Sequence, residues 1–443
     1  MNGRWLALAI ACAGCGDNLT RPADPLAPVS GARLALQKYR YDDGTEQAVA
    51  TEFYDTELHV RCTPQPWPDA AVRCVPSVDD AEYTDPACTA LVGLGRTITK
   101  PTHFVARDAA TGAMTHVWRA GAAIAPIAQT YAIAGGACVG PTPVPAGLIS
   151  FFAVGDEVDA TALVAFHTAE IDDDRLGVQL RETDDGLRVP SGLRDRALDA
   201  ACTATVQGDG SVVCEPAGAA TASWFRDPGC SEPVVAAGAS APAIARFIEP
   251  SGCASYHRVG PEVTSPVYRR DGDACTPVDA SALGQLFAVG EPIELPVLGR
   301  VLEGAPGRRL QRIFLGHGAL RVPDDRLFDT ALGLDCKPRA LRDTVRCLPA
   351  SAIAATTLFS DSGCTTQIRV AELPRHSCER PAFATANRPF QVRAIGEVAT
   401  SPVFQAVGGT CQPYTGAPSN ELRALGAPID LTTFPSAIYF GER

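Results

Sequence analysis

The sequence lacks the short motifs by which catalytic and nucleotide-binding sites are recognised. It contains no GxSxG, no P-loop, no GxGxxG ahead of a helix and no HExxH. Nucleophile elbows, phosphate-binding loops and helical zinc sites are therefore not indicated. No two of the seven histidines have metal-ligand spacing. We expect neither a metal nor a cofactor, and we assign no catalytic residue.

Long apolar runs and basic runs are lacking as well. The longest N-terminal apolar run, Trp5–Ala13, is too short to cross a bilayer, which takes about 20 residues. The chain carries 50 Asp and Glu against 38 Lys and Arg, a net charge of −12, and no basic run stands out. A nucleic-acid partner is therefore not expected.

The N-terminus has the pattern of an export signal. Arg4 precedes the apolar run, and Cys15 is followed by Gly16-Asp17-Asn18, as at the start of a mature bacterial lipoprotein. We predict that residues 1–15 are a lipoprotein signal peptide and that Cys15 carries the lipid. The expected location is the cell envelope, at the outer membrane by default, with the lipid as the membrane contact.

Two alternatives to Cys15 stay open. Cys12 also ends an apolar run of small residues, and an ordinary secretory signal would be cleaved near residues 14–16. In each case residues 16–32 are Pro-rich and aperiodic, which predicts a tether between the membrane and the folded body.

Export determines whether the cysteines are interpreted as disulfides or as metal ligands. Of the 16 cysteines, Cys12 and Cys15 lie at the signal, which leaves 14. In an exported protein such cysteines are disulfide candidates. No CxxC occurs beyond Cys15, so the close thiolate spacing of zinc sites is lacking.

A pattern of about 135 residues occurs three times. Such a period is the first feature to settle, because it determines how the rest of a sequence is interpreted. We predict repeats at 33–172, 173–307 and 308–443. The equivalent positions are Cys62, Cys202 and Cys336; Cys88, Cys230 and Cys364; Cys138, Cys275 and Cys411; and Gly155, Gly290 and Gly426.

Each repeat is predicted to be built of strands. Leu58, Val60 and Cys62 alternate with polar residues, which is typical of a half-buried strand. We expect about eight strands per repeat and no long amphipathic helix, and therefore an all-β fold. Eight strands would make two blades, so three repeats would make a six-bladed β-propeller. The alternative is three tandem β-domains, each with a core of its own.

Two sets of aspartates recur with the repeat. Asp85 and its equivalents end a strand ahead of a turn, where an aspartate hydrogen-bonds turn backbone. Asp55 and its equivalents are interpreted as structural turn or cap residues, because a catalytic pair would need two carboxylates in different environments. The remaining members are Asp195 and Asp329, and Asp227 and Asp361.

Several segments resemble those of an existing group of proteins. The FDTxLGxDC, VRCLP, FSDSGC and SPVY…GxxC segments are similar to those of uncharacterised cysteine-containing β-repeat lipoproteins of myxobacteria, over nearly the whole mature chain. The resemblance implies an exported all-β repeat protein. It implies no activity and supplies no catalytic residue.

The spacing of the cysteines predicts their pairing. Cys62 and Cys74 are expected opposite each other on one face of a hairpin, within disulfide reach, which leaves Cys88 for Cys138. Repetition then gives Cys202–Cys214, Cys336–Cys347, Cys230–Cys275 and Cys364–Cys411. Cys253 and Cys378 are left over; we expect them to be unpaired or paired with each other, and displacement of a partner in this scheme is a third possibility.

Two functions from different classes are compatible with these features. The first is a non-catalytic binding or scaffold module at the cell envelope, with a protein or glycan ligand. The second is an exported hydrolase with a site in a central cleft. An enzyme should show one repeat whose extra polar residues break the threefold pattern, and the sequence shows none beyond the cysteine differences.

Overall fold

The fold is all-β, as predicted. The computed structural model describes residues 24–441 except for short gaps at 77–78, 96–100, 108–111, 113, 146–148, 208, 239–240, 250–252, 265, 272–273, 343, 375–380, 388, 415 and 417–419. Over these residues the chain forms 38 strands and three single-turn 3-10 helices, and no α-helix. The prediction of about eight strands per repeat is too low, because many strands have only two to five residues.

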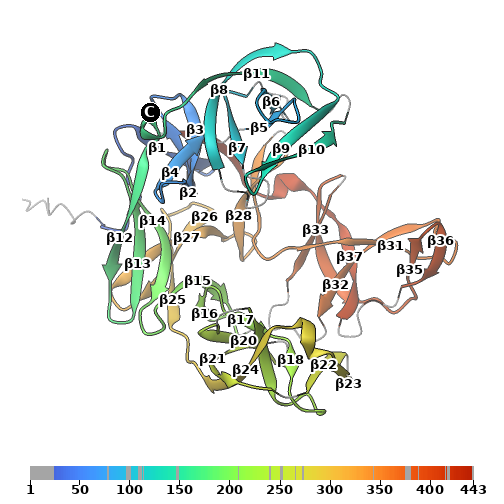
Figure 1. Ribbon diagram of the computed structural model, residues 1–443. Coiled ribbons are helices and arrows are strands. Elements are labelled where there is room, and N and C mark those ends of the chain that lie inside the picture. Colours follow the sequence, from blue (N-terminus) through green and yellow to red (C-terminus); the bar gives the residue numbers. More distant parts are fainter. Residues whose placement is uncertain are drawn as a thin grey trace, which may run out of the picture.

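Fifteen strands form one closed barrel, to which each predicted repeat contributes five. The ring closes where β38 pairs with β1 from Gln37 opposite Gly441 to Tyr41 opposite Ala437, so the C-terminal end lies beside β1 (Figure 1). The barrel strands are β1 (Leu34–Tyr41), β2 (Glu46–Asp55), β3 (Val60–Pro66), β4 (Val72–Pro76) and β12 (Ala165–Asp172); β13 (Leu176–Glu182), β14 (Arg188–Asp195), β15 (Ala200–Val206), β16 (Val212–Pro216) and β25 (Val297–Glu303); and β26 (Leu310–His317), β27 (Leu320–Asp329), β28 (Leu334–Ala340), β29 (Val345–Pro349) and β38 (Ser436–Gly441).

This topology corrects both predicted architectures. The described strands do not form six four-stranded blades, and the repeats are not separate domains, because neighbouring repeats share the barrel and repeats 1 and 3 are hydrogen-bonded to each other. The apolar clusters of the barrel also contain residues from more than one repeat. The cluster around Phe53 and Cys62 of repeat 1 includes Leu187 and Val189, which belong to repeat 2. Each of the three barrel clusters therefore joins two neighbouring repeats.

Each repeat inserts a second sheet between its fourth and fifth barrel strands. In the first sheet β5 pairs with β6 and, through Asp79 and Asp80, with β7. The strands β5–β6–β11–β8–β7 thereby form a closed ring, and the β9–β10 hairpin pairs with β5 outside this ring. The strands are β5 (Asp79–Tyr83), β6 (Leu91–Gly95), β7 (His103–Arg107), β8 (Met114–Ile124), β9 (Gln129–Ala134), β10 (Ala137–Pro143) and β11 (Ser150–Glu157).

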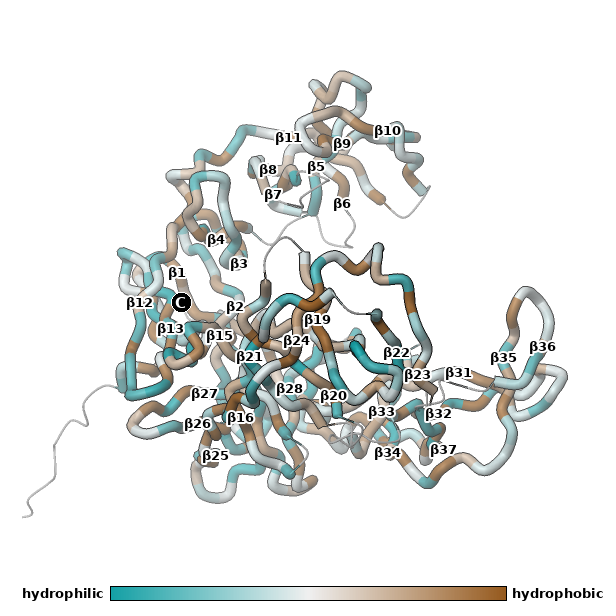
Figure 2. Tube along the Cα trace, turned by 60° about the horizontal axis from the view of Figure 1, so that its bottom comes forward, coloured by the Kyte–Doolittle hydropathy of each residue, from teal (hydrophilic) through white to brown (hydrophobic). Residues whose placement is uncertain are grey.

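The other two sheets repeat this arrangement, with the strand equivalent to β5 divided into two short strands. The edge hairpins β22–β23 and β35–β36 correspond to β9–β10, and β35–β36 extends well away from the rest of the chain (Figures 1 and 2). The strands are β17 (Ala220–Ala222), β18 (Trp224–Phe225), β19 (Pro233–Ala237), β20 (Ile244–Ile248), β21 (Ala254–Glu262), β22 (Val267–Asp271), β23 (Ala274–Val278) and β24 (Gln285–Pro292); and β30 (Ile353–Ala354), β31 (Thr356–Phe359), β32 (Gln367–Pro374), β33 (Phe383–Ala386), β34 (Gln391–Val398), β35 (Phe404–Val407), β36 (Thr410–Pro413) and β37 (Asn420–Ile429).

The repeated glycines of the sequence lie where two strands of each inserted sheet approach closely. In the first sheet β8 and β11 pair with two register shifts. A Cβ on Gly155 would lie 3.0 Å from the carbonyl oxygen of Arg119, and one on Gly121 would lie 2.8 Å from that of Ala153. A side chain at Gly155, or at Gly290 in the second sheet, would therefore crowd the backbone of the paired strand, whereas a Cβ on Gly426 in the third sheet would lie 3.6 Å from the carbonyl oxygen of Ala394, an ordinary contact.

All six predicted disulfides are present. The hairpin pairs differ from the prediction in register: Cys62 lies opposite Pro76, and Cys74 lies opposite Pro64. The two cysteines are diagonal neighbours, and the twist of the hairpin brings their Cα atoms to 5.2 Å. The longer pairs join each edge hairpin to the turn after β5 or its equivalent, for example Cys88 to Cys138.

The remaining cysteines are only partly described. Cys253 is disulfide-bonded, so the alternative that leaves it unpaired is wrong. Cys378 lies outside the described residues, as do Cys12 and Cys15. The predicted lipidation site, the signal peptide and most of the tether therefore remain expectations from the sequence.

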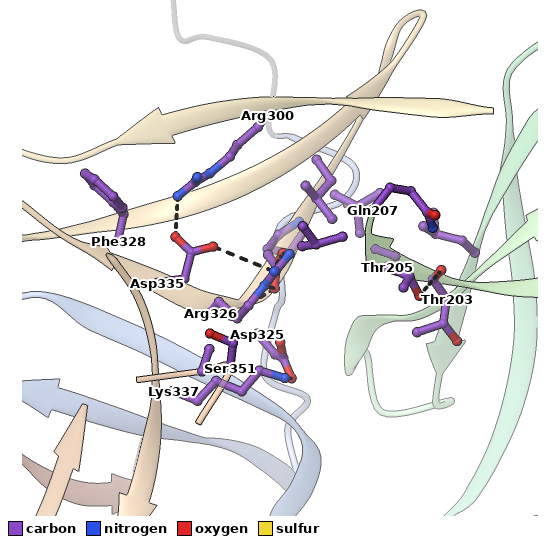
Figure 3. A pocket seen from close by; sticks show the side chains of 18 of the residues that line it. Thr203, Thr205, Gln207, Arg300, Asp325, Arg326, Phe328, Asp335, Lys337 and Ser351 are labelled. Carbon is purple, nitrogen blue, oxygen red and sulfur yellow. Dashed lines mark hydrogen bonds and ion pairs between the residues drawn. The ribbon is translucent and has the colours of Figure 1, made fainter. Parts of the chain in front are cut away.

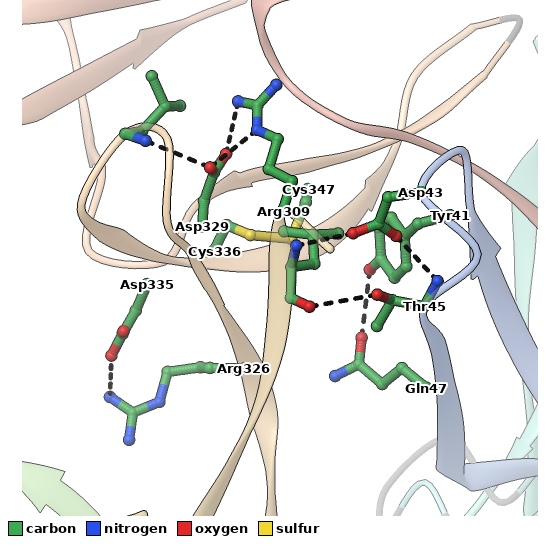
Figure 4. The surroundings of a disulfide bond; sticks show 12 residues. Tyr41, Asp43, Thr45, Gln47, Arg309, Arg326, Asp329, Asp335, Cys336 and Cys347 are labelled. Carbon is green, nitrogen blue, oxygen red and sulfur yellow. Dashed lines mark hydrogen bonds and ion pairs between the residues drawn. A yellow bond between two sulfur atoms is a disulfide. The ribbon is translucent and has the colours of Figure 1, made fainter. Parts of the chain in front are cut away.

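An arginine–aspartate clamp occurs once in each repeat of the barrel (Figure 4). In repeat 3, Arg309 donates to Asp329 and also to the carbonyl oxygen of Thr433, 2.8 Å away. Asp329 is fully buried and accepts backbone N–H groups of Ala331 and Leu332. The recurring aspartates are structural turn residues, as predicted, and their arginine partners were not predicted. The equivalent clamps are Arg33–Asp55 and Arg175–Asp195.

Candidate functional site

A cleft lies between repeats 2 and 3 (Figure 3). Its volume is about 900 Å³, within the range of about 300–1,000 Å³ that is usual for small-molecule sites. One wall comes from β15 and the adjoining part of β14, and the other from β25, β27 and β28. The polar side chains of the cleft are Ser191, Thr203, Thr205, Gln207, Arg300, Asp324, Asp325, Arg326, Asp335, Lys337 and Ser351.

A chain of ion pairs connects the side chains of the wall formed by β25, β27 and β28. Arg300 pairs with one oxygen of Asp335, and Arg326 Nη1 lies 3.7 Å from the other. The Arg326 Nε atom is also 3.0 Å from both carboxylate oxygens of Asp324. Each carboxylate in this chain is thus held by a planar guanidinium, whose fork matches carboxylate geometry.

Lys337 forms a second, more exposed pair nearby. Its Nζ atom lies 2.7 Å from Asp325, whose side chain is largely exposed. The adjacent Asp324 is by contrast 5% exposed. The exposed pair contributes little to stability, so its place at the cleft is not explained by a need to hold the fold together.

The two inner carboxylates have opposite pKa shifts. Burial raises the pKa of Asp335, and the effects of Arg300 and Arg326 do not cancel this. Burial would also raise the pKa of Asp324, but hydrogen bonds from Arg326 outweigh it and hold the pKa below its usual range. The same guanidinium therefore contacts two carboxylates whose environments differ.

The charged wall breaks the threefold pattern of the barrel. In the strand pairing Pro190 and Leu193 of repeat 2 correspond to Pro323 and Leu327 of repeat 3, so Ser191-Gly192 stand where repeat 3 has Asp324-Asp325-Arg326. In repeat 1 the equivalent strand, β2, carries Glu52, which accepts a hydrogen bond of 2.8 Å from Tyr439 at the boundary of repeats 3 and 1. Among the described residues, the chain of Asp324, Arg326 and Asp335 in repeat 3, joined by Arg300 of β25, has no equivalent in the other repeats. The extra polar residues expected of an enzyme are therefore present, and the expectation that the sequence has none is wrong.

Sequence analysis missed this cleft. Asp324-Asp325-Arg326 follow Arg321-Val322-Pro323, which repeats Arg188-Val189-Pro190 of repeat 2, so the charges stand within an otherwise similar strand. Aligning the three repeats on Asp55, Asp195 and Asp329 would have shown the extra charges. Their meeting with Arg300 and with β15 depends on strand pairing, which the alignment does not contain.

The histidines are spread over the molecule, as expected. His116 pairs with Glu157 at 2.6 Å on an exposed surface, and His257 contacts the carbonyl oxygen of Gly290 at 3.0 Å. His103 is the exception, because it is 2% exposed and its Nε2 atom has no hydrogen-bond partner. Burial lowers its pKa, and Arg119 lowers it further.

The turn aspartates are structural, as predicted. Asp361 accepts backbone N–H groups from Gly363, Thr365 and Thr366. These bonds lower the pKa of Asp361 to about 2. Asp85 and Asp227 make the same type of turn beside Cys88 and Cys230.

Over the described ranges, no group of three or more His, Cys, Asp or Glu side chains is placed to hold a metal ion. A separate search of the same residues finds no helix that is both long and apolar enough to span a membrane.

The chain belongs to a family of unknown function, DUF7481, which matches residues 8–434. No curated protein and no solved structure matches the chain. The family assignment brings no activity with it. Function has to be argued from the residues of this chain.

Proposed function

We propose that this protein is an exported, lipid-anchored binding or scaffold module of the cell envelope, without catalytic activity. The signal-like N-terminus and the resemblance to myxobacterial β-repeat lipoproteins support export and anchoring. The closed barrel supports the binding role, because it holds three inserted sheets and the cleft on one closed ring of strands. Sites built on such frameworks keep their geometry.

One observation carries the choice of binding over catalysis. Every charged side chain named in the cleft is paired with another: Arg300 and Arg326 with Asp335, Arg326 with Asp324, and Lys337 with Asp325. A general acid or base must exchange a proton with a substrate. Carboxylates already held by guanidinium groups are suited to orienting a ligand.

Binding without turnover is tested with isolated envelope fractions. The purified full-length chain, with its disulfides intact, is mixed with outer-membrane and cell-wall material and sedimented. We expect saturable binding and no time-dependent release of fragments, followed by mass spectrometry. The absence of binding to every fraction would contradict the proposal.

Hydrolysis is the second candidate, and the opposite pKa shifts of Asp324 and Asp335 favour it. Pairs of carboxylates with separated pKa values are typical of acid–base catalysis. In this case Asp335 would be the acid. Fragments that accumulate with the wild type and not with Asp335→Asn would replace the binding proposal by this one.

Anchoring has its own prediction. Cys15→Ser should prevent lipid attachment and move the protein from the membrane fraction to the soluble exported fraction. Intact-mass analysis of the wild type should find the lipid on Cys15. A lipid on Cys12, or a mature protein without lipid, would contradict the assignment.

A further inference from the structure

We propose that the cleft between repeats 2 and 3 binds an uncharged oligosaccharide. This inference names the ligand class of the binding role proposed above and rests on that role. Three features of the cleft carry it: balanced charge, fixed planar hydrogen-bonding groups on one wall, and a row of neutral polar groups on the other (Figure 3).

The charges in the cleft are balanced. Three cations face three anions, and each is satisfied by its neighbours. A site for a charged ligand concentrates one sign of charge, because complementary potential attracts that ligand. This cleft lacks such an excess, so its ligand needs no net charge. The cations are Arg300, Arg326 and Lys337, and the anions are Asp324, Asp325 and Asp335.

The wall formed by β25, β27 and β28 offers donors and acceptors side by side in fixed positions. Asp335 is held from two sides by Arg300 and Arg326, yet a carboxylate has about four acceptor sites and a guanidinium five donors. Both groups therefore keep capacity for a ligand. Neighbouring hydroxyl groups of a sugar each donate and accept, so they match an adjacent carboxylate and guanidinium.

The opposite wall carries neutral polar groups on one face of a strand. Thr203, Thr205 and Gln207 follow one another at every second position of β15 and the residue after it, so they are spaced by about 7 Å. Ser351 adds a further hydroxyl. A row of this kind fits an extended polyhydroxylated chain.

An aromatic ring completes the site. Phe328 lines the cleft, and the guanidinium carbon of Arg300 lies 5.1 Å from its centroid. The stacking limits the motion of Arg300, which keeps the donor in place. A mixture of apolar and polar lining residues is usual in small-molecule sites. The apolar residues suit the apolar faces of sugar rings.

The test measures binding of defined oligosaccharides to the full-length chain with intact disulfides. Neutral gluco-, manno- and N-acetylglucosamine oligomers are compared with uronate and sulfated oligomers by saturation-transfer NMR and calorimetry. We expect at least one neutral oligomer to bind saturably. Thr203→Val/Thr205→Val should weaken that binding at least tenfold, because the shape stays and the hydroxyl groups are lost.

Thr63→Val is the matched control. Thr63 follows Cys62 as Thr203 follows Cys202, on the equivalent barrel strand, and does not line the cleft. It should bind as the wild type does. Equal urea midpoints for both variants and the wild type establish that they are folded.

Three results would overturn the inference: no neutral oligomer binds, the double variant binds as tightly as the wild type, or only charged oligomers bind and salt weakens them. Binding to envelope fractions without binding to any neutral oligomer would remove this inference and leave the proposed function intact. If the protein binds neither envelope fractions nor neutral oligomers, both this inference and the proposed function are contradicted.

Discussion

At the residue scale, His103 stands out because its equivalents are apolar. In the paired strands of the other two sheets, Ile244 and Phe383 occupy its position. The lowered pKa of His103 means that the folded protein resists its protonation. Stability should therefore be full above the unfolded pKa of about 6.5 and fall as the pH drops through the folded value.

We accordingly expect His103→Ile to flatten the loss of stability between pH 7 and pH 5. Urea midpoints measured across this range check it. His167→Gln is the control, since the side chain of His167 is half exposed. Parallel pH profiles for the wild type and His103→Ile would show that His103 has no part in acid sensitivity.

At the element scale, the three inserted sheets are joined to the barrel in two ways. In repeat 1 the junction is apolar, with Val75, Val105 and Val117 in one cluster. In repeat 2 the equivalent residues are Glu215, Arg246 and Tyr256. Arg246 Nε lies 3.3 Å from Glu215 and 3.4 Å from the Tyr256 hydroxyl. Burial and the bond with Glu215 raise the pKa of Tyr256 to about 12.

A partly solvated polar junction holds less tightly than a dry apolar one. We predict that the amides of β20 and β21 exchange with solvent faster than those of β7 and β8, measured by hydrogen-exchange mass spectrometry. Replacing Glu215, Arg246 and Tyr256 together by Val should slow exchange in the second sheet. Equal rates in the first two sheets would contradict this view of the junction.

Disulfide pairing and strand pairing differ in how far they could be predicted from the sequence. The cysteine pairs were predictable because period-2 alternation places Cys62 and Cys74 on one face and repetition fixes the rest. The partners of the strands were not, because β4 pairs with β12 only after the whole inserted sheet has intervened. The propeller was wrong for this reason, and the cleft, which depends on the same pairings, was missed with it.

At the scale of the whole molecule, closure of the barrel predicts tolerance of circular permutation. A chain that begins at Asp174, in the turn after β12, and joins Gly441 to Asp24 by a Gly/Ser linker keeps all fifteen strand pairings. We expect it to retain the far-ultraviolet spectrum and a urea midpoint close to the original. Deletion of β38 should instead disrupt all three repeats, because β1 and β29 both lose a partner. A folded deletion variant beside an unfolded permutant would contradict closure as the basis of stability.

The pairing of β1 with β38 also determines when, during synthesis of the chain, the barrel can close. β1 is the first barrel strand to be made, and its partner is the last. Until that partner has been translated, one edge of the first repeat stays open, with unpaired backbone groups that favour association with other chains. Completion of the ring therefore cannot proceed domain by domain on a growing chain. Until β38 has paired with β1, the chain is therefore prone to associate with other chains.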